Sequence, residues 1–236
     1  MPSNKPLIET YLSIRQNRWY WLFALFCRVS LAFAFIAAGL VKIVGERFAN
    51  GLSELHPMGS YLTALHDTGY YYTFIGYLQV LAAVLLIIPR TVVLGALIYF
   101  PIILNICILS SAVRFEGSIV TAPLMVMANL FLLVWNYDKL QYVLPLKRNQ
   151  LIPLIERPKQ YSKGFPWLFA GFVGLMVALT LFIAEFGFDI MPRNSLKDCK
   201  AQFTNQGIQT KGYEFCECIH VQGNSLNECL NLMTIN

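Results

Sequence analysis

The sequence is poor in charged residues. Lysine, arginine, aspartate and glutamate make up 13% of its 236 residues, whereas hydrophobic residues make up 56%. In a soluble domain, about a quarter of the residues are usually charged. This deficit excludes an ordinary soluble domain and indicates a protein that lies in a membrane.

Long stretches without charge account for most of the deficit. Five segments approach the ~20 apolar residues that a helix needs to cross a hydrocarbon core of about 30 Å. They are residues 19–44, 71–89, 92–112, 119–135 and 166–187. The alternating segments of a membrane barrel are lacking, and a helix pairs its own backbone groups within lipid. We therefore predict an all-α membrane protein with five transmembrane helices.

Basic residues are scarce on one side of these segments. If the N-terminus lies inside, only Arg47 and Arg114 fall in the outer loops between spans. The inner side then holds Lys5, Arg15, Arg18, Arg90, Lys139, Lys147, Arg148, Arg157, Lys159 and Lys163. Because short basic loops stay on the cytoplasmic side, we predict a multi-pass protein of a bacterial inner membrane with a cytoplasmic N-terminus. The basic residues then contact membrane lipid, and we predict no nucleic-acid partner.

An odd number of spans places the C-terminal part outside the cytoplasm. The predicted parts are a cytoplasmic lead (1–18), a four-helix membrane bundle (19–136), a basic cytoplasmic loop (137–165), a fifth transmembrane helix (166–187) and an extracytoplasmic tail (188–236). The first apolar run is too long for a signal peptide and carries an arginine, so we expect this helix to be retained.

Cysteine is rare in the spans and concentrated in the tail, at Cys199, Cys216, Cys218 and Cys229. A tail of this size needs covalent staples to fold, and cysteine-dense segments belong to oxidising compartments. One residue separates Cys216 from Cys218, so these two pair poorly with each other. We therefore expect Cys199 to pair with one of them and Cys229 with the other, joining two short helices.

Two alternatives for the tail involve its histidine. On an extended strand, Cys216, Cys218 and His220 would share a face and could hold zinc or copper, or the two cysteines could exchange thiols. An oxidising compartment favours structural disulfides, and we predict no metal site. His56 and His66 lie in one outer loop with few further ligands, so we interpret them as ordinary loop residues.

Charge is nearly lacking inside the spans, which makes the exceptions informative. Arg28 and Lys42 fall on one stripe of the first helix together with Gly39, and charged residues in a membrane normally face the bundle interior. Polar residues at matching depths are Gln79, Asn105, Asn129 and Glu185. These six residues form our candidate polar membrane pocket.

Three interpretations of this set stay open. The first is a contact between helices, in which Arg28 binds the amides and Lys42 pairs with Glu185. The second is a pocket for the head group of a quinone or a lipid. The third is a proton or ion path, which the lack of an acidic residue in mid-membrane disfavours.

Two stretches carry a family resemblance, "RVSLAFAFIAAGLVKIVG" and "GYLQVLAAVLLIIPRTVVLGALIYFPIILNI". Over residues 28–135 the chain resembles the DoxX-like family of small membrane proteins, which implies a four-helix membrane bundle. The matching positions are Arg28, Gly39, Lys42 and Arg90, whereas Gln79 stands where many relatives have a glutamate. Some members resemble subunits of quinone-linked enzymes such as thiosulfate:quinone oxidoreductase, which makes a quinone the candidate cofactor.

The sequence lacks a Walker loop, a dinucleotide fingerprint and the GxSxG and HExxH motifs. Without a complete catalytic constellation, we predict an accessory or structural membrane subunit that binds a protein partner, a second copy or a lipid-like ligand. One alternative is a membrane subunit of a quinone-linked oxidoreductase. Another is a thiol-relay membrane protein that uses the tail cysteines.

Overall fold

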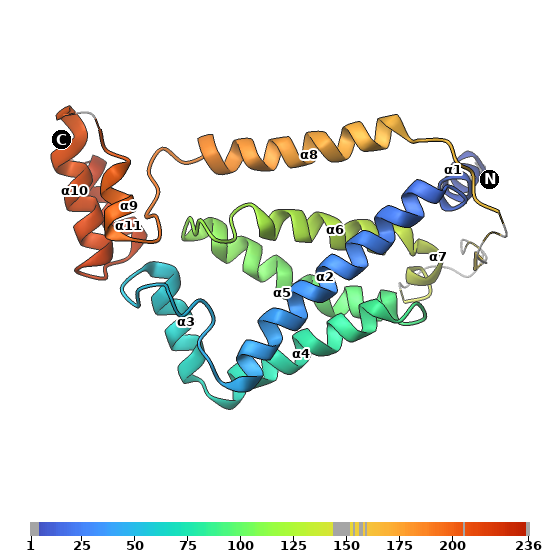
Figure 1. The fold of residues 1–236 in the computed structure, drawn as a ribbon, viewed down its shortest axis with the longest axis horizontal. Coiled ribbons are helices and arrows are strands. Elements are labelled where there is room, and N and C mark those ends of the chain that lie inside the picture. The colour runs from blue at the N-terminus through green and yellow to red at the C-terminus, as the bar shows by residue number, and fades with distance from the viewer. Residues whose placement is uncertain are drawn as a thin grey trace.

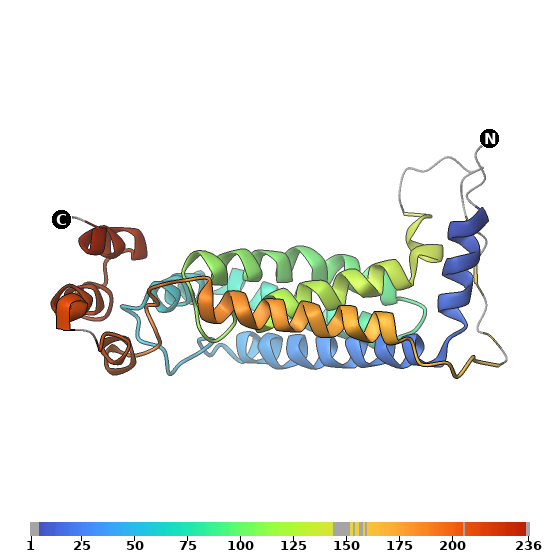
Figure 2. The same cartoon turned by 90° about the horizontal axis from the view of Figure 1, so that it is seen from above.

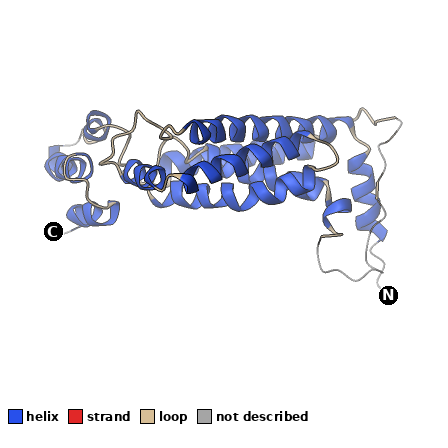
Figure 3. Ribbon diagram, turned by 90° about the horizontal axis from the view of Figure 1, so that it is seen from below, coloured by secondary structure: helices blue, strands red, loops and turns tan. Residues whose placement is uncertain are grey.

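A computed structural model describes residues 5–143, 152, 154, 155, 158, 160–204 and 206–234, and most of these residues lie in helices. The helices are α1 (Lys5–Arg15), α2 (Arg18–Val44), α3 (Pro57–Asp67), α4 (Tyr70–Ile87), α5 (Val92–Ala112), α6 (Thr121–Trp135), α7 (Tyr137–Leu140), α8 (Trp167–Phe186), α9 (Leu196–Ala201), α10 (Gln206–His220) and α11 (Leu226–Thr234). Figures 1 and 3 show this arrangement, in which the described residues form no strand. The predicted all-α class is confirmed.

Four helices, α2, α4, α5 and α8, are long and apolar enough to cross a membrane. The predicted boundaries agree with them closely: the expected span at 92–112 is α5 itself. The fourth expected span, 119–135, contains the shorter helix α6, whose 15 residues rise about 22 Å. It packs lengthwise against α5 and α2.

The core of the bundle lies among α2, α4, α5 and α6. The most extensive contact joins α2 to α4, where Gly39 and Gly76 face each other. A Cβ atom added to either glycine would lie 2.8 Å from the backbone oxygen of the other. Small residues let membrane helices approach closely, so this pair of glycines sets the spacing between α2 and α4.

Helix α8 lies beside the bundle and buries little of its own surface. Its contact with the other helices centres on Phe169, whose ring packs against Tyr20 and Phe23 of α2 and Phe131 of α6. Most other α8 side chains are exposed. Figure 2 shows α8 running along the bundle, with α1 nearly perpendicular to it at one end. We call that end the α1 end and the opposite end the tail end.

The tail forms three short helices, α9 to α11, rather than the two that we predicted. Disulfides join Cys199 to Cys216 and Cys218 to Cys229, which confirms the prediction of two bridges and decides between the two pairings left open. Around the sulfur atoms lie the buried residues Phe215, Ile219 and Leu226. The strand suggested for residues 216–220 is wrong, because they belong to α10.

The predicted basic loop, 137–165, is described only in part. It begins with α7, and its last residues lie against the start of α2, where Asn17 forms an isolated bridge with Ser162 and its amide donates to the Gly164 carbonyl oxygen at 2.8 Å. Lys147, Arg148, Arg157 and Lys159 lie outside the described residues. The backbone of Lys5 is described, as the first residue of α1.

Candidate ligand cavity

A cavity of about 510 Å³ opens among α2, α3, α4, α5 and α6, in the half of the bundle nearest the tail. Pockets for small molecules commonly measure ~300–1,000 Å³ and are mostly apolar with few polar groups. This cavity has that character, because its walls are aliphatic and aromatic side chains such as Phe35, Leu78 and Ile103. Lys42, Gln79 and Asn105 are among the polar residues that line it.

Lys42 is the cation of the cavity. Its side chain is 7% exposed, and its ammonium group donates to the Ala38 carbonyl oxygen, one turn earlier in α2, at 3.1 Å. The same nitrogen lies 4.7 Å from the ring centre of Phe48 and 5.7 Å from that of Tyr72. An ammonium group has three N–H donors, so Lys42 has donors left for a ligand.

Gln79 contributes an unsatisfied acceptor. The residue is 1% exposed, and its Oε1 atom has no hydrogen-bond partner. Leaving a buried polar atom without a hydrogen bond costs ~1–3 kcal/mol of stability. A bound molecule that donates a hydrogen bond to this atom would remove that cost. Because Gln79 also lines the cavity, a ligand with a hydrogen-bond donor can supply that partner.

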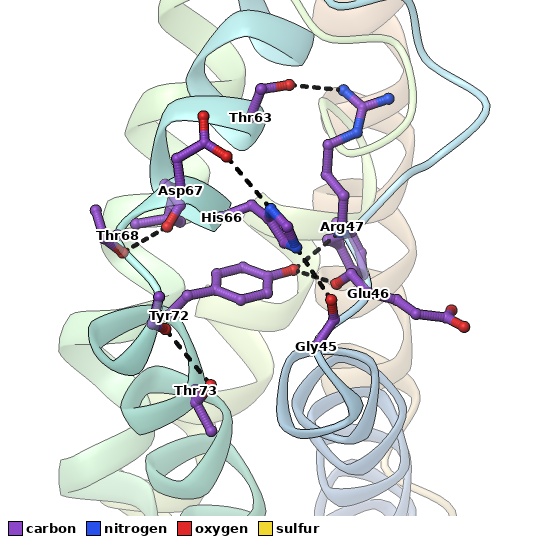
Figure 4. A network of polar contacts seen from close by, with 12 residues as sticks. Gly45, Glu46, Arg47, Thr63, His66, Asp67, Thr68, Tyr72 and Thr73 are labelled. Carbon is purple, nitrogen blue, oxygen red and sulfur yellow. Dashed lines mark hydrogen bonds and ion pairs between the residues drawn. The ribbon is translucent and has the colours of Figure 1, made fainter.

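Residues of α3 and of the segment that connects α2 to α3 line the cavity at its tail end. Figure 4 shows the polar network that holds this segment. Arg47 donates to the Thr63 hydroxyl at 3.0 Å and to the Leu52 carbonyl oxygen at 2.6 Å. Below it, the Tyr72 hydroxyl donates to the Glu46 carbonyl oxygen at 2.9 Å, and His66 Nε2 lies 3.0 Å from the Gly45 carbonyl oxygen. This network fixes the segment against the start of α4.

The structure does not bring all six predicted pocket residues together. Asn105 is exposed on α5 and lines the cavity with Lys42 and Gln79. Asn129 is buried between α6 and α5, where its amide donates to the Ala96 carbonyl oxygen at 3.1 Å. It therefore joins two helices and does not line the cavity.

Arg28 has a different role from the expected contact with amides. Its Nε and Nη2 atoms donate to the carbonyl oxygens of Leu86 and Ile87 at 2.9 and 2.6 Å. The last carbonyls of a helix lack partners within that helix, and Pro89 prevents α4 from continuing. Arg28 therefore caps the end of α4.

Glu185 does not pair with Lys42. The ion pairs among the described residues are His66–Asp67, Arg193–Glu116 and Lys200–Glu217, and Glu185 is exposed near the end of α8. The expectation rested on the two residues lying at the same depth in the membrane. The ring contacts between α8 and α2 involve Phe169, which lies near the start of α8, whereas Glu185 lies near its end.

Sequence reasoning missed three residues that shape this end of the bundle. Tyr72 is 2% exposed. Its hydroxyl is both a donor and an acceptor toward the segment after α2, because it also accepts from the Phe48 N–H at 2.9 Å. Ser110 and Ser118, whose hydroxyls lie 2.5 Å apart, link α5 to the turn before α6 beside the cavity. Nothing in the run of three tyrosines at 70–72 sets Tyr72 apart in the sequence.

Comparison with known proteins places the chain in a family. No family model matches it, and no solved structure matches it. Over 113 residues, covering 46% of this chain and 72% of the relative, it is 38% identical to the uncharacterized protein YwoB of Bacillus subtilis (strain 168). The chain belongs to the same family as YwoB. More than half of this YwoB-family chain lies outside the matched region.

In this member of the YwoB family, the tail docks on the segment before α3. His56 is fully buried there, and its ring centre lies 5.8 Å from that of His220 in α10. His56 Nδ1 accepts from the Met58 N–H at 3.1 Å, and the ring is buried near the backbone of Arg193. His56 thus lies in the loop before α3, as we expected, but it is buried under the tail. The described residues offer no group of three or more metal-ligating side chains.

Burial of His56 predicts that acid loosens the docked tail of this YwoB-family protein. Burial, together with the nearby His220, lowers the pKa of His56 from 6.5 to about 4, although the backbone of Arg193 opposes part of the shift. Between pH 6.5 and about 4 the undocked state binds a proton that the docked state does not, so docking weakens as the pH falls through this window. The protection factors of the amides in α3 and α10, which correct for the slower intrinsic exchange at low pH, should be lower at pH 5 than at pH 7.

The control for this prediction is His56→Gln, which keeps a polar side chain but does not titrate. Its protection factors in α3 and α10 should differ little between the two pH values. If the wild-type protein and this variant show the same change between pH 7 and pH 5, the pH dependence does not come from His56.

Proposed function

We propose that this chain is an integral inner-membrane protein that binds one lipid-like ligand in the cavity. The observation that carries the proposal is that Gln79, whose Oε1 is buried and unpaired, lines a mostly apolar cavity together with Lys42. A matching ligand has a long apolar part and a head group with two features. It offers a hydrogen-bond donor to Gln79 and a carbonyl oxygen or an anion to Lys42.

A quinone is the second candidate, supported by the resemblance to DoxX-like proteins. The two redox forms of a quinone fit the cavity differently. The carbonyl oxygens of the oxidised form accept hydrogen bonds, which suits Lys42 and the amide of Asn105 but leaves Gln79 Oε1 unpaired. The reduced form carries hydroxyl groups that can donate to Gln79. Membership of the YwoB family does not bear on the DoxX-like resemblance, which stays a prediction.

The proposed membrane arrangement has five spans, with α6 as the shortest, and a cytoplasmic α1 end. The tail then lies outside the cytoplasm, where its two disulfides persist. We propose an accessory role in which the docked tail or exposed α8 contacts a protein partner or a second copy. Thiol relay is the less favoured alternative, because Cys216 and Cys218 belong to different disulfides.

Native mass spectrometry of protein released gently from its own membrane tests the ligand proposal. We expect one ligand to remain bound to the wild-type protein, and its mass distinguishes a quinone from another lipid. Lys42→Met and Gln79→Leu should each lower retention about tenfold, because the loss of one buried hydrogen bond costs ~1.5 kcal/mol.

Lys163→Met is the matched control for Lys42→Met, because it removes an exposed lysine that does not line the cavity. It should retain the ligand as the wild-type protein does. If the wild-type protein retains only a mixture of bulk phospholipids, and the Gln79→Leu variant retains the same lipids in the same proportions, the ligand proposal is wrong.

A further inference from the structure

The ligand cavity opens on one side, at an edge that α4 and α5 share. Tyr71 and Phe74 line it from α4 and are 50% and 52% exposed, and Asn105 lines it from α5 and is exposed as well. Lining residues on the opposite side, such as Phe35 of α2, are buried. The cavity therefore runs from the interior of the bundle to the outer surface of two helices that are long and apolar enough to cross a membrane.

The two helices at this edge touch at one end and separate toward the other. Near their turn, a Cβ atom added to Gly95 of α5 would lie 2.7 Å from the backbone nitrogen of Leu86 in α4. Figure 1 shows α4 and α5 diverging from that turn toward the tail end. Toward the α1 end, the ring of Phe35 stacks on that of Tyr99 with their centres 3.4 Å apart, so packed side chains limit the cavity there. The opening thus lies where α4 and α5 are apart.

Helix α3 obstructs direct access to the cavity from the tail end. Its residues Met58 and Leu62 are 4% and 8% exposed, and they pack in one cluster with Leu109 and Val113 near the end of α5. Helix α8 contributes no lining residue, and Figure 1 shows it on the opposite side of the bundle from α4. A molecule that approaches from the side meets exposed residues, whereas one that approaches from the tail end has to pass between packed ones.

Asn105 is a polar residue on this edge, at a depth that belongs to the membrane interior. It lies seven residues before the end of α5, which corresponds to about 10 Å along the helix. Its amide forms no hydrogen bond with any residue that the structure describes. An asparagine in a membrane helix normally binds a neighbouring helix, as Asn129 does in this bundle. A polar group of the ligand can serve as the partner of Asn105.

Gln79 is the inner counterpart of Asn105. It lies nine residues after the start of α4, about 13 Å along that helix, and its Oε1 atom is buried without a hydrogen-bond partner. A head group that moves from the edge to Gln79 therefore stays below the membrane surface throughout. Because a charge at that depth is costly, the head group that takes this route is uncharged. A hydroxyl group fits best, since it can donate to Gln79 and also accept from Lys42.

We infer that the ligand enters the cavity from within the membrane, between α4 and α5, and that it is a lipid whose small, uncharged head group carries hydroxyls. The head group binds Gln79 and Lys42, and the apolar chain passes out beside Phe74 into the half of the membrane nearest the tail. Asn105 binds the polar group that joins the head to the chain. This inference rests on the proposed ligand cavity, to which it adds a route of entry and a chemical class.

The test is photo-crosslinking in phosphatidylcholine vesicles with two probe lipids that share the same oleoyl chain. Monooleoylglycerol has an uncharged glycerol head group, and oleoyl lysophosphatidic acid carries a phosphate on the same glycerol. Benzoylphenylalanine replaces either Leu78, which lines the cavity one helical turn further in, or Phe74 at the edge. Both positions should capture monooleoylglycerol at least tenfold more than the lysophosphatidic acid. The new bond should lie in the glycerol part at position 78 and in the oleoyl chain at position 74.

Two variants of α5 give a matched comparison. Asn105→Leu should lower the capture of monooleoylglycerol at position 78 several-fold. Leu104→Ala is the control and should leave it unchanged, because Leu104 is the neighbouring exposed residue and does not line the cavity. Unfolding temperatures of both variants should equal that of the wild-type protein, which separates a loss of binding from a loss of folding.

Three results would overturn the inference. Equal capture of the two probes would contradict an uncharged head group. Capture by benzoylphenylalanine at position 65 of α3, which also lines the cavity, without capture at position 74 would contradict entry from the side. The third result is no capture of monooleoylglycerol at all. If native mass spectrometry still finds a specific ligand on the wild-type protein, this inference fails and the proposed function stands; if it finds none, both fail.

Discussion

Replacing Cys199 and Cys216 by serine is expected to unfold the tail. The disulfide between them closes a loop of 17 residues, and the second bridge closes one of 11. Cross-links over loops of this length contribute about 3 kcal/mol each by constraining the unfolded chain. The core of the tail consists largely of the bridged cysteines and a few apolar neighbours, and is too small to replace that contribution.

Limited trypsin digestion measures this effect. Lys200 and Lys211 lie within the three-helix tail, so the double variant should be cleaved there at least tenfold faster than the wild-type protein, while the bundle stays intact. Cys107→Ser is the control, because it removes a thiol that forms no disulfide. Equal cleavage rates for the double variant and the control would show that the disulfides are not needed to fold the tail.

Alanine at Gly39 and Gly76 is expected to destabilise the bundle. Each new methyl group would lie 2.8 Å from a backbone oxygen of the facing helix, and one at Gly76 would also lie 2.9 Å from the Cβ atom of Lys42. Alanine favours a helix over glycine by ~1 kcal/mol, but overpacking costs ~1–3 kcal/mol at each site. The double variant should therefore unfold at a lower temperature and retain less ligand.

Gly174→Ala makes the same chemical change but is expected to have the opposite effect on the unfolding temperature. Gly174 lies in α8 with nothing within 4 Å of an added Cβ atom, so alanine there gains helix propensity without a collision. Its unfolding temperature should stay level or rise. A rise for Gly39→Ala and Gly76→Ala as well would mean that the two glycines do not set the spacing between α2 and α4.

Hydrophobic runs predicted the helices well because their signal is local. Each expected span contains a helix whose ends lie within two or three residues of those predicted. The disulfides were predictable in number but not in pairing. The pairing depends on Cys216 and Cys218 lying on one helix, where residues two apart point to different sides.

The partners of the charged residues were not predictable, because they depend on how distant segments pack. Arg28 was expected to bind another polar side chain, yet it binds carbonyl oxygens that the turn at Pro89 leaves free at the end of α4. His56 was interpreted as an ordinary loop residue, and nothing local indicated that a tail more than a hundred residues later in the chain would cover it. Gln79 was recognised as a pocket residue from its depth alone.

A photo-crosslinking amino acid placed in the cavity tests the central claim most directly. Phe74 lines the cavity and is 52% exposed, whereas Phe172 of α8 is 58% exposed and lies outside it. Benzoylphenylalanine at either position, activated in the native membrane, labels the molecules beside it, which mass spectrometry then identifies. We predict one dominant lipid-like adduct at position 74 and a mixture of bulk phospholipids at position 172. The same mixture at both positions would contradict a specific ligand in the cavity.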